Sequence, residues 1–518
     1  MATAHQKLAL SLAILKSIQD RGVRVIKASE HKALTRVHRE RLQAAGFIKP
    51  AMPGWYLPSR PDEQSGDSTS WYANMEAFVA AYANFRFGSS WQLAPDQSLV
   101  IQSGETTVSH QIQIHSPKAS NDVIQLPHRC SLFLYKVKPD ALSTQVIVNG
   151  NGLRLVPLEE CLFKLPASFY ELRPEVAHIA LRRADLNALM RLVLPDGSTT
   201  IAGRLVGALT AVGRKEDANL LASTMTAAGH SLRITNPFVV PLRDMTNSRS
   251  ESPYVQRIRL MWADMREQVI TAWANVPNSA PQDIDRFMAD VESRYAADAL
   301  NSLSIEGYAV TPELIERVRS GQWSPEVHAV DRDMMNAMAA KGYYETYKQV
   351  TSLIKQVLQE KSSPGALLRK CLAHWHLALF SSSVTAGIVT AADLAGYRNR
   401  PVFIRNAEHV PPPAEALMDA MEVLFELLAN ETNAAVRAVL GHFVFVFIHP
   451  YIDGNGRLGR FILNFMLATG GYMWTVVPVN QRTKYMDALA KASSRRDIAP
   501  FAQMMARLAT EQASTPLG

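Results

Sequence analysis

Residues 449–460 read HPYIDGNGRLGR, and these residue types at this spacing could bind a polyphosphate and activate a nucleophile. The stretch lies between two apolar runs, AAVRAVLGHFVFVFI before it and FILNFMLATGG after it. Pro450 ends the first run as a helix and favours an extended backbone at His449. The sequence therefore predicts a loop that joins two buried helices and lies at the N-terminus of the second.

That position explains the glycines and arginines of the loop. A helix N-terminus offers unpaired N–H groups and the positive end of the helix dipole, which together suit an anion. Gly454 and Gly456 let the backbone turn these N–H groups inward and let a bulky anion come close. Arg457 and Arg460 are three residues apart, so they share one helix face and can hold two phosphates.

The remaining polar residues of the loop complete the predicted chemistry. Asp453 is suited to hold a magnesium ion that bridges phosphate oxygens. Asn455 can steady a phosphate oxygen through its amide. The His449 imidazole, with an ordinary pKa of about 6.5, can take a proton from a hydroxyl. The sequence thus predicts a site that holds a magnesium-bound polyphosphate beside a general base.

A dinucleotide-binding fold is the competing interpretation of this stretch. GNGRLG satisfies the pattern G-x-G-x-x-G, and FVFVFI before it could be a strand. That fold also needs an acidic residue about 20 positions further on to bind a ribose. Residues 461–486 contain no Asp or Glu, and no strand–helix–strand pattern surrounds the motif. The polyphosphate interpretation is therefore favoured.

The same twelve residues resemble the signature of the Fic family, His-x-Phe-x-(Asp/Glu)-Gly-Asn-Gly-Arg-x-x-Arg. Tyr451 stands where the family has Phe, a ring that normally packs into the core. Upstream, the sequence WHLALF followed by AGIVTAADLAGYRNRPVFI resembles the family's preceding helix and its flap, around Val402, Phe403 and Ile404. In the family this flap pairs with the backbone of the target protein as an added strand.

The resemblance covers residues 290–505 and implies an all-helical fold that transfers AMP from ATP to a protein hydroxyl. By this analogy His449 deprotonates the target Ser, Thr or Tyr. The resemblance also implies that Asp453 and Asn455 bind Mg²⁺ and the α-phosphate. It implies that Gly454 and Gly456 supply backbone N–H donors, and that Arg457 and Arg460 bind the β- and γ-phosphates.

Residues 302–307, SLSIEG, resemble a second Fic-family motif, the inhibitory helix (Ser/Thr)-x-x-x-Glu-(Gly/Asn), here near residues 300–310. Ser302 and Glu306 are four residues apart and face the same way on a helix, and Gly307 follows them. In the family the glutamate pairs with the second motif arginine, here Arg460, and keeps the γ-phosphate of ATP out of position. The resemblance implies autoinhibition. In some relatives the same glutamate serves removal of AMP, and the sequence does not separate the two roles.

A basic block precedes these motifs. Residues 1–60 hold eleven Lys and Arg against three acids, a net charge of +8 in a chain that nets +7 overall. Helices are expected at 5–20 and 32–45, followed by two short apolar runs around a Pro-Gly turn. This order resembles the winged helix-turn-helix of abortive-infection antitoxins, which implies DNA binding. The expected contacts are Arg36, Arg39 and Arg41 on or beside the recognition helix and Lys49 in the wing.

The chain is therefore expected to be a multidomain protein with three parts. Residues 1–60 form the winged helix-turn-helix, and a polar linker follows at 59–70. Residues 71–245 form a mixed α+β region of unknown role, with strands expected at SLVIQ, HQIQIH and SLFLYKV. Residues 255–512 form the all-α Fic domain.

Composition excludes several protein classes. No apolar run approaches the roughly 18 residues of a membrane span. Three cysteines, Cys130, Cys161 and Cys371, are too few and too scattered for a disulfide framework, which fits a reducing, cytoplasmic setting. No zinc-ligand spacing occurs. The oligomeric state stays open, with a homodimer as one alternative.

Three alternatives to an autoinhibited protein adenylyltransferase stay open at this stage. The chain could be a DNA-binding repressor or antitoxin that uses the Fic domain as a nucleotide sensor. It could be a hydrolase that removes AMP. It could also transfer a different phosphate-containing group. The intact motif favours an enzyme, because a sensor would not need His449.

Overall fold

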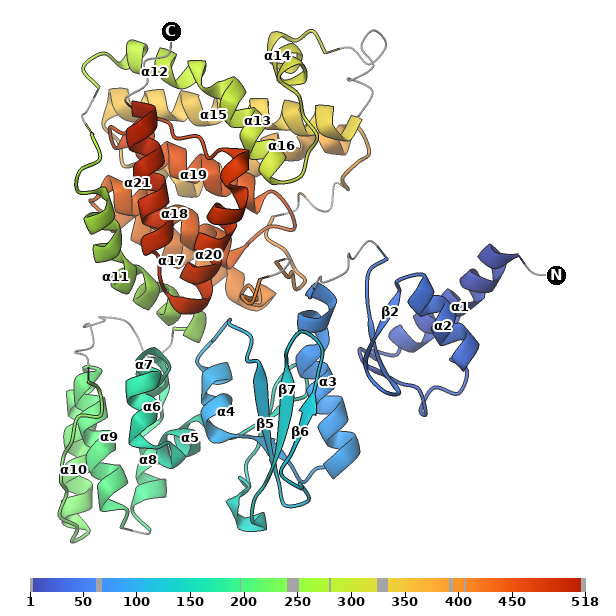
Figure 1. Ribbon diagram of the computed structural model, residues 1–518. Helices are drawn as coiled ribbons and strands as arrows, with labels where there is room; N and C mark the ends of the chain where they lie inside the picture. Colours follow the sequence, from blue (N-terminus) through green and yellow to red (C-terminus); the bar gives the residue numbers. More distant parts are fainter. Residues whose placement is uncertain are drawn as a thin grey trace. The chain divides into compact units, whose positions relative to one another are not determined.

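The computed structural model describes residues 3–61, 68–195, 197–239, 251–278, 281–323, 334–390, 394, 396–404 and 407–513. The chain forms two compact units (Figure 1). The first comprises Met1–Pro253 together with Phe403–Val410, and the second comprises Tyr254–Val402 together with Pro411–Gly518. Half of the predicted linker, residues 62–67, lies outside the described residues.

The N-terminal part of the first unit contains two helices and a three-stranded antiparallel sheet of order β1-β3-β2. The elements are α1 (Ala4–Gln19), β1 (Ile26–Lys27), α2 (Arg36–Ala44), β2 (Ile48–Met52) and β3 (Trp55–Pro58). The predicted helices and hairpin are present, but the second helix begins at Arg36 after Thr35, not at residue 32. Strand β1 was not expected from the sequence.

A four-stranded sheet follows, of order β4-β5-β7-β6. Strands β5 and β7 are parallel, and the other two pairings are antiparallel. The bounds are α3 (Thr69–Phe87), β4 (Gln92–Leu93), β5 (Gln111–Ser116), β6 (Asp122–Gln125), β7 (Ser131–Lys136), and a hairpin of β8 (Ile147–Val148) and β9 (Arg154–Leu155).

Two of the three strands expected in this region are confirmed, as β5 and β7. The third expectation, a strand at SLVIQ, is wrong. These residues end α4 (Pro95–Gln102), which has Pro95 in its first turn and buries Leu99 against the helices that follow. Proline is favoured at the first position of a helix, and this signal outweighs the β-branched residues later in the segment.

A group of helices completes the first unit. They pack around their own apolar cluster, separate from that of the sheet. Their bounds are α5 (Leu158–Lys164), α6 (Ala167–Leu172), α7 (Pro174–Arg183), α8 (Leu186–Val193), α9 (Thr199–Ala211) and α10 (Lys215–Ala227). Residues 407–410 also belong to this unit, since Val108 N–H donates to the Glu408 carbonyl at 3.0 Å and Val410 N–H donates to the Thr106 carbonyl at 2.8 Å.

The second unit is helical, and no strand is assigned within its described residues, as the sequence predicts. One continuous apolar cluster joins its helices. They are α11 (Pro253–Trp273), α12 (Ile284–Ser293), α13 (Tyr295–Ile305), α14 (Pro312–Ser320), α15 (Met334–Glu360), α16 (Pro364–Thr385), α17 (Leu417–Asn430), α18 (Ala434–Ile448), α19 (Asn455–Thr469), α20 (Arg482–Arg495) and α21 (Ala499–Ala513). Helices α18 and α19 lie side by side, and α15 and α16 pack against α19 (Figure 1).

The helices in the described part of the chain all fall short of the length and apolarity needed to cross a lipid bilayer.

Candidate functional site

The predicted loop joins α18 to α19, and both helices are buried along almost their whole length. Gly454 precedes α19 with a φ of 86°, a left-handed conformation that glycine adopts without strain. His449 ends α18, but the expected extended conformation is wrong. Its φ and ψ are 52° and 58°, which is left-handed. Pro450 prevents the helix from continuing but tolerates this helix-ending geometry.

Asn455 holds the loop in shape from inside. Its Oδ1 accepts from the Tyr451 N–H at 3.0 Å, and its Nδ2 donates to the Tyr451 carbonyl at 2.9 Å. The side chain is buried, with 2% of the residue exposed. Each polar atom of the amide thus makes one bond to the backbone, and the second N–H of Nδ2 has no role in these two bonds, so a contact of Asn455 with phosphate stays a prediction. Its role in this structure is to fold the loop.

Tyr451 is buried, as expected for the residue that replaces Phe in the motif. Its ring stacks on His376 of α16, with centroids 3.9 Å apart and planes 8° apart. Burial lowers the pKa of His376 to about 4, so this imidazole is neutral at physiological pH. The sequence did not indicate this stacking, because it depends on how α16 packs against the loop.

Arg457 lies in a cage of aromatic and acidic groups. Its guanidinium is 5.1 Å from the Tyr308 ring centroid and 4.9 Å from that of Phe380. Its Nη2 donates to Asp453 Oδ2 at 3.2 Å. Only 1% of Arg457 is exposed, while the Asp453 side chain is 63% exposed. The two residues predicted to bind phosphate and magnesium are thus paired with each other here.

The predicted pairing of Glu306 with Arg460 is present. Arg460 Nη2 donates to Glu306 Oε1 at 2.7 Å and to the Ser302 carbonyl at 3.0 Å. Arg460 Nε donates to the Ser302 hydroxyl at 2.8 Å. Gly307, with a φ of 91°, then turns the chain out of α13. The two ends of the inhibitory motif therefore bind one guanidinium that lies 154 residues away in sequence from Glu306.

The Glu306 carboxylate also lies against the N-terminus of α19. A side-chain carbon on Gly456 would collide with this carboxylate, so Gly456 is what allows the approach. Burial raises the pKa of Glu306, but the charges of Arg460 and Arg457 outweigh burial and hold it below its ordinary value. An ionised carboxylate thus occupies the place where the sequence predicts an anionic ligand.

A buried acid anchors α13, the helix that carries Ser302, to the rest of the unit. The Tyr343 hydroxyl of α15 donates to Asp298 Oδ2 of α13 at 2.6 Å. Burial raises the pKa of Asp298 to about 6. Sequence reasoning missed this pair. The available signal was one acidic residue, Asp298, on the mainly apolar buried face of residues 295–305.

The electrostatic surroundings keep His449 neutral. Burial lowers the pKa of its half-buried ring to about 4, with a further lowering from the charge of Arg398. The Val446 carbonyl, 3.3 Å from Nδ1, and the carboxylates of Glu306 and Asp453 act in the opposite direction but are weaker. A neutral imidazole is the form that can accept a proton.

Asp453 is the one motif residue suited to Mg²⁺. Among the described residues no group of three or more His, Cys, Asp or Glu side chains could hold a metal ion. Magnesium is usually bound by one or two carboxylates together with substrate phosphates and water. A single exposed carboxylate beside an anion-binding helix end therefore fits Mg²⁺ that arrives with a nucleotide.

The flap residues Val402, Phe403 and Ile404 are half-buried, and no strand is assigned to them. Val402 belongs to the second compact unit, whereas Phe403 and Ile404 belong to the first. Their pairing with a target strand stays a prediction.

The residues predicted to contact DNA divide into two groups. The Arg36 side chain is 84% exposed and pairs with Glu40 at 2.7 Å. Arg39 Nη1 instead donates to the Leu34 carbonyl at 2.6 Å, and Arg41 Nη1 donates to the Lys7 carbonyl at 3.0 Å. These bonds hold Arg39 and Arg41 against the N-terminal fold, and the contact of the three arginines with DNA stays a prediction. Lys49 lies half-buried in β2.

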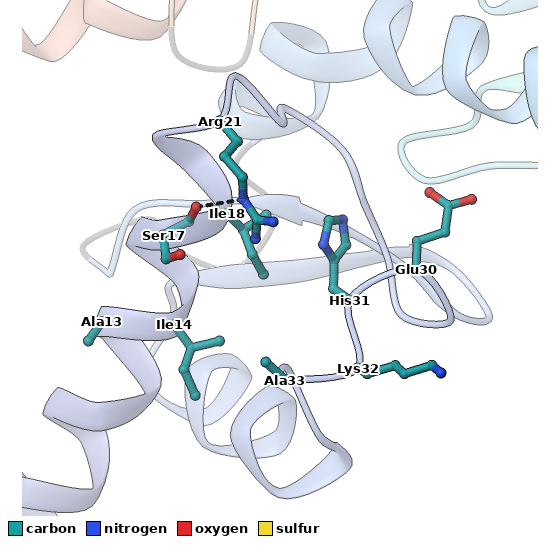
Figure 2. Close-up of a pocket in the computed structure, with 9 residues that line it drawn as sticks. All are labelled: Ala13, Ile14, Ser17, Ile18, Arg21, Glu30, His31, Lys32 and Ala33. Atoms are coloured by element: carbon teal, nitrogen blue, oxygen red, sulfur yellow. Dashed lines mark hydrogen bonds between the residues drawn. The ribbon is translucent and has the colours of Figure 1, made fainter.

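A hollow of about 430 Å³ lies on the N-terminal helix α1 and the turn before α2 (Figure 2). At its edge Arg21 Nε donates to the Ser17 carbonyl at 3.0 Å. None of the motif residues lines it. The lining residues are Ala13, Ile14, Ser17, Ile18, Arg21, Glu30, His31, Lys32 and Ala33.

Comparisons with known proteins confirm the resemblance to the Fic family. Residues 369–467 match the Fic/DOC family. Protein adenylyltransferase Fic of Drosophila willistoni is 35% identical over 114 residues, which are 21% of this chain and 22% of that protein. Its Drosophila virilis counterpart is 34% identical over 114 residues, 21% of this chain and 23% of that protein. The chain thus spans about a fifth of the length of the curated relatives it matches.

Parts of the chain are also similar to solved structures of Fic proteins. Fic-1 from C. elegans has a TM-score of 0.35 and 18% sequence identity, covering 66% of this chain and 95% of that one. A Fic domain containing signaling protein from Bacteroides thetaiotaomicron has a TM-score of 0.33 and 18% identity, covering 50% of this chain and 94% of that one.

Proposed function

We propose that this protein transfers AMP from ATP to a hydroxyl of another protein. The premise is that residues 369–467 match the Fic/DOC family. The observation that carries the proposal lies inside the matched residues. A neutral His449 stands at the end of α18, directly before an α19 N-terminus that carries two buried arginines. A base next to an anion-binding helix end suits attack of a hydroxyl on a phosphorus atom.

In the proposed reaction His449 takes the proton of a Ser, Thr or Tyr hydroxyl. The hydroxyl oxygen then forms a bond to the α-phosphorus of ATP, and the bond from that phosphorus to the pyrophosphate oxygen breaks. The N–H groups at the start of α19 stabilise negative charge on the phosphates. Arg457 and Arg460 hold the leaving pyrophosphate. Asp453 would hold Mg²⁺, which supplies positive charge to the phosphate oxygens when it is bound.

Mass spectrometry provides the direct test of this function. The Glu306→Gly variant, incubated with ATP, Mg²⁺ and a cell lysate, is expected to produce proteins that carry the mass of AMP on a hydroxyl residue. The same lysate with the Glu306→Gly, His449→Ala double variant serves as the control. A different added mass would favour transfer of another phosphate-containing group instead.

We also infer that the protein rests in an autoinhibited state. The Glu306 carboxylate, bonded to Arg460 at 2.7 Å and seated on the α19 N-terminus, supports this inference because it competes with a phosphate for the same groups. Asp453 engages Arg457 at the same time. Both arginines are therefore paired with a carboxylate at the place where the proposed triphosphate binds.

The pH dependence of transfer tests the role of His449. Because its pKa is about 4, the imidazole stays neutral down to that pH, and it loses its function as a base only as pH falls through that value. We expect kcat/KM of the Glu306→Gly variant to stay level from about pH 8 to pH 5, whereas a base with an ordinary pKa loses activity near pH 6.5. Circular dichroism at each pH checks that the protein is folded. A half-maximal value near pH 6.5 would contradict the neutral, buried base.

A second function, DNA binding by the N-terminal residues, is supported by the net charge of +8 in residues 1–60 and by the outward position of Arg36. Fluorescence anisotropy with a labelled duplex across a salt titration should give a log–log slope that becomes shallower by about 0.9 in Arg36→Ala, since one phosphate contact is lost. Lys348→Ala, which removes an exposed charge from the second unit, should leave the slope unchanged. A slope that is the same in wild type and Arg36→Ala would exclude this contact.

A further inference from the structure

Arg398 lies four residues before the expected flap and is buried, with 3% of the residue exposed. Its guanidinium binds carbonyl oxygens at the end of α18. Nε donates to the His449 carbonyl at 2.8 Å, and Nη2 donates to the Ile448 carbonyl at 3.4 Å. The last carbonyls of a helix have no partner within the helix, so a buried helix end needs such a donor. Arg398 fills this need at the residue that carries the proposed base.

The same side chain also binds two other carbonyls, and the Arg398 backbone binds a third. Nη2 donates to the Pro412 carbonyl at 2.5 Å, and Nη1 donates to the Arg400 carbonyl at 3.2 Å. The Arg398 backbone N–H donates to the Pro450 carbonyl at 2.9 Å. One residue therefore ties together the chain entering the flap, the chain leaving it at Pro412, and both sides of His449. Burial lowers the pKa of Arg398 to about 10, so the guanidinium remains charged at neutral pH.

The backbone of His449 needs this support. A φ of 52° is unfavourable for a residue with a Cβ, and such conformations persist where the surroundings hold them in place. The His449 N–H donates to the Phe445 carbonyl at 3.0 Å, which fixes one side of the residue. The bonds from Arg398 to the carbonyls of His449 and Pro450 fix the other side. The direction of the imidazole follows from this backbone.

We propose that Arg398 is a positioning residue for the proposed transfer reaction: by holding the carbonyl of His449 it fixes the left-handed backbone that aims the imidazole at the target hydroxyl. The inference rests on the proposed function, in which His449 is the base. Arg398 touches neither nucleotide nor target in this role. It acts through His449. Because Arg398 also binds the Arg400 carbonyl, it connects the orientation of the His449 ring to the segment that leads into the flap.

The decisive comparison uses Arg398→Met, which keeps the length of the side chain but removes its donors, in the Glu306→Gly background. We expect kcat to fall by about 100-fold, the effect typical of a displacement of about 1 Å in a catalytic group, with KM for ATP little changed. Arg398→Lys retains a charge but not the planar fork of donors, so it should restore kcat only in part. Arg507→Met, which removes an exposed arginine of α21 paired with Glu511, should leave kcat unchanged.

Two further measurements separate positioning from a loss of folding. Three charged groups act on His449: the Arg398 guanidinium and the carboxylates of Glu306 and Asp453. The Arg398 charge lowers the pKa of His449, and the two carboxylates raise it. Arg398→Met should therefore move the acidic limb of kcat/KM to higher pH, and Arg398→Lys should not. Carbethoxylation of His449 by diethylpyrocarbonate, followed by mass spectrometry, needs no activity. We expect faster labelling in Arg398→Met, because the ring is no longer held.

The outcomes separate this inference from the proposed function. An unchanged kcat in Arg398→Met would overturn the positioning role. Equal losses in the Met and Lys variants, with a lower unfolding temperature and no shift of the acidic limb, would also overturn it and leave a purely structural role. If the Glu306→Gly parent transfers no AMP, the proposed function fails, and the labelling of His449 still decides whether Arg398 orients the ring.

Discussion

Replacing Glu306 by glycine should raise AMP transfer from ATP by about 10- to 100-fold over the wild-type protein, since a hydrogen bond to a charged group contributes about 1.5–3 kcal/mol. The bond that is removed joins Glu306 Oε1 to Arg460 Nη2 at 2.7 Å. Its loss frees the guanidinium and clears the N-terminus of α19 for phosphate. Incorporation of radiolabelled AMP into total lysate protein measures the effect.

Two companion variants make this result specific. Glu306→Gln keeps the size of the side chain but removes its charge, and we expect it to release most of the inhibition. Glu313→Gly replaces an exposed glutamate of α14 that does not contact the motif, and we expect wild-type transfer. Equal incorporation by the wild type and Glu306→Gly would show that the carboxylate does not inhibit.

The same variants address the hydrolase alternative. If Glu306 positions water for removal of AMP, protein labelled beforehand should lose its AMP when wild-type protein is added. Glu306→Gly and Glu306→Gln should then remove the label more slowly. If neither wild type nor variant removes the label, the glutamate acts only as an inhibitor of transfer.

The second large effect is expected from His449→Ala in the Glu306→Gly background. We expect transfer to fall by about 10²- to 10⁴-fold, the usual contribution of a positioned general base. ATP binding should persist, because the helix N-terminus and both arginines remain. Isothermal titration calorimetry with ATP and Mg²⁺, run beside the transfer assay, measures both quantities.

His374→Ala provides the matched control, because this exposed histidine of α16 lies outside the motif. We expect it to retain both ATP binding and transfer. Full transfer by the His449→Ala variant would exclude His449 as the base and would favour the alternative in which the domain senses nucleotide without reacting.

The sequence was sufficient to predict the loop between α18 and α19. Two long apolar runs, a proline and paired glycines are local signals, and local signals determine where helices begin and end. The pairing of Glu306 with Arg460 was available only through family resemblance. Their separation of 154 residues means that no local pattern could have indicated the contact.

The errors arose where tertiary contacts decide the outcome. The left-handed backbone of His449 depends on hydrogen bonds from Arg398 to carbonyls, and the sequence analysis gave Arg398 no role although it lies in the stretch that resembles the flap region. The bonds that Arg39 and Arg41 donate to the carbonyls of Leu34 and Lys7 were likewise not expected from the sequence. In each case the residue type was visible in the sequence, while its partner was determined by packing.

The pairing of Arg457 with Asp453 and of Arg460 with Glu306 has a thermodynamic consequence for nucleotide affinity. Triphosphate binding is an exchange of anions, since each guanidinium leaves a carboxylate when it takes up phosphate. The electrostatic energy lost with the carboxylates therefore offsets part of the energy gained with the phosphates. A modest change on the carboxylate side of this exchange is enough to change the occupancy of the site.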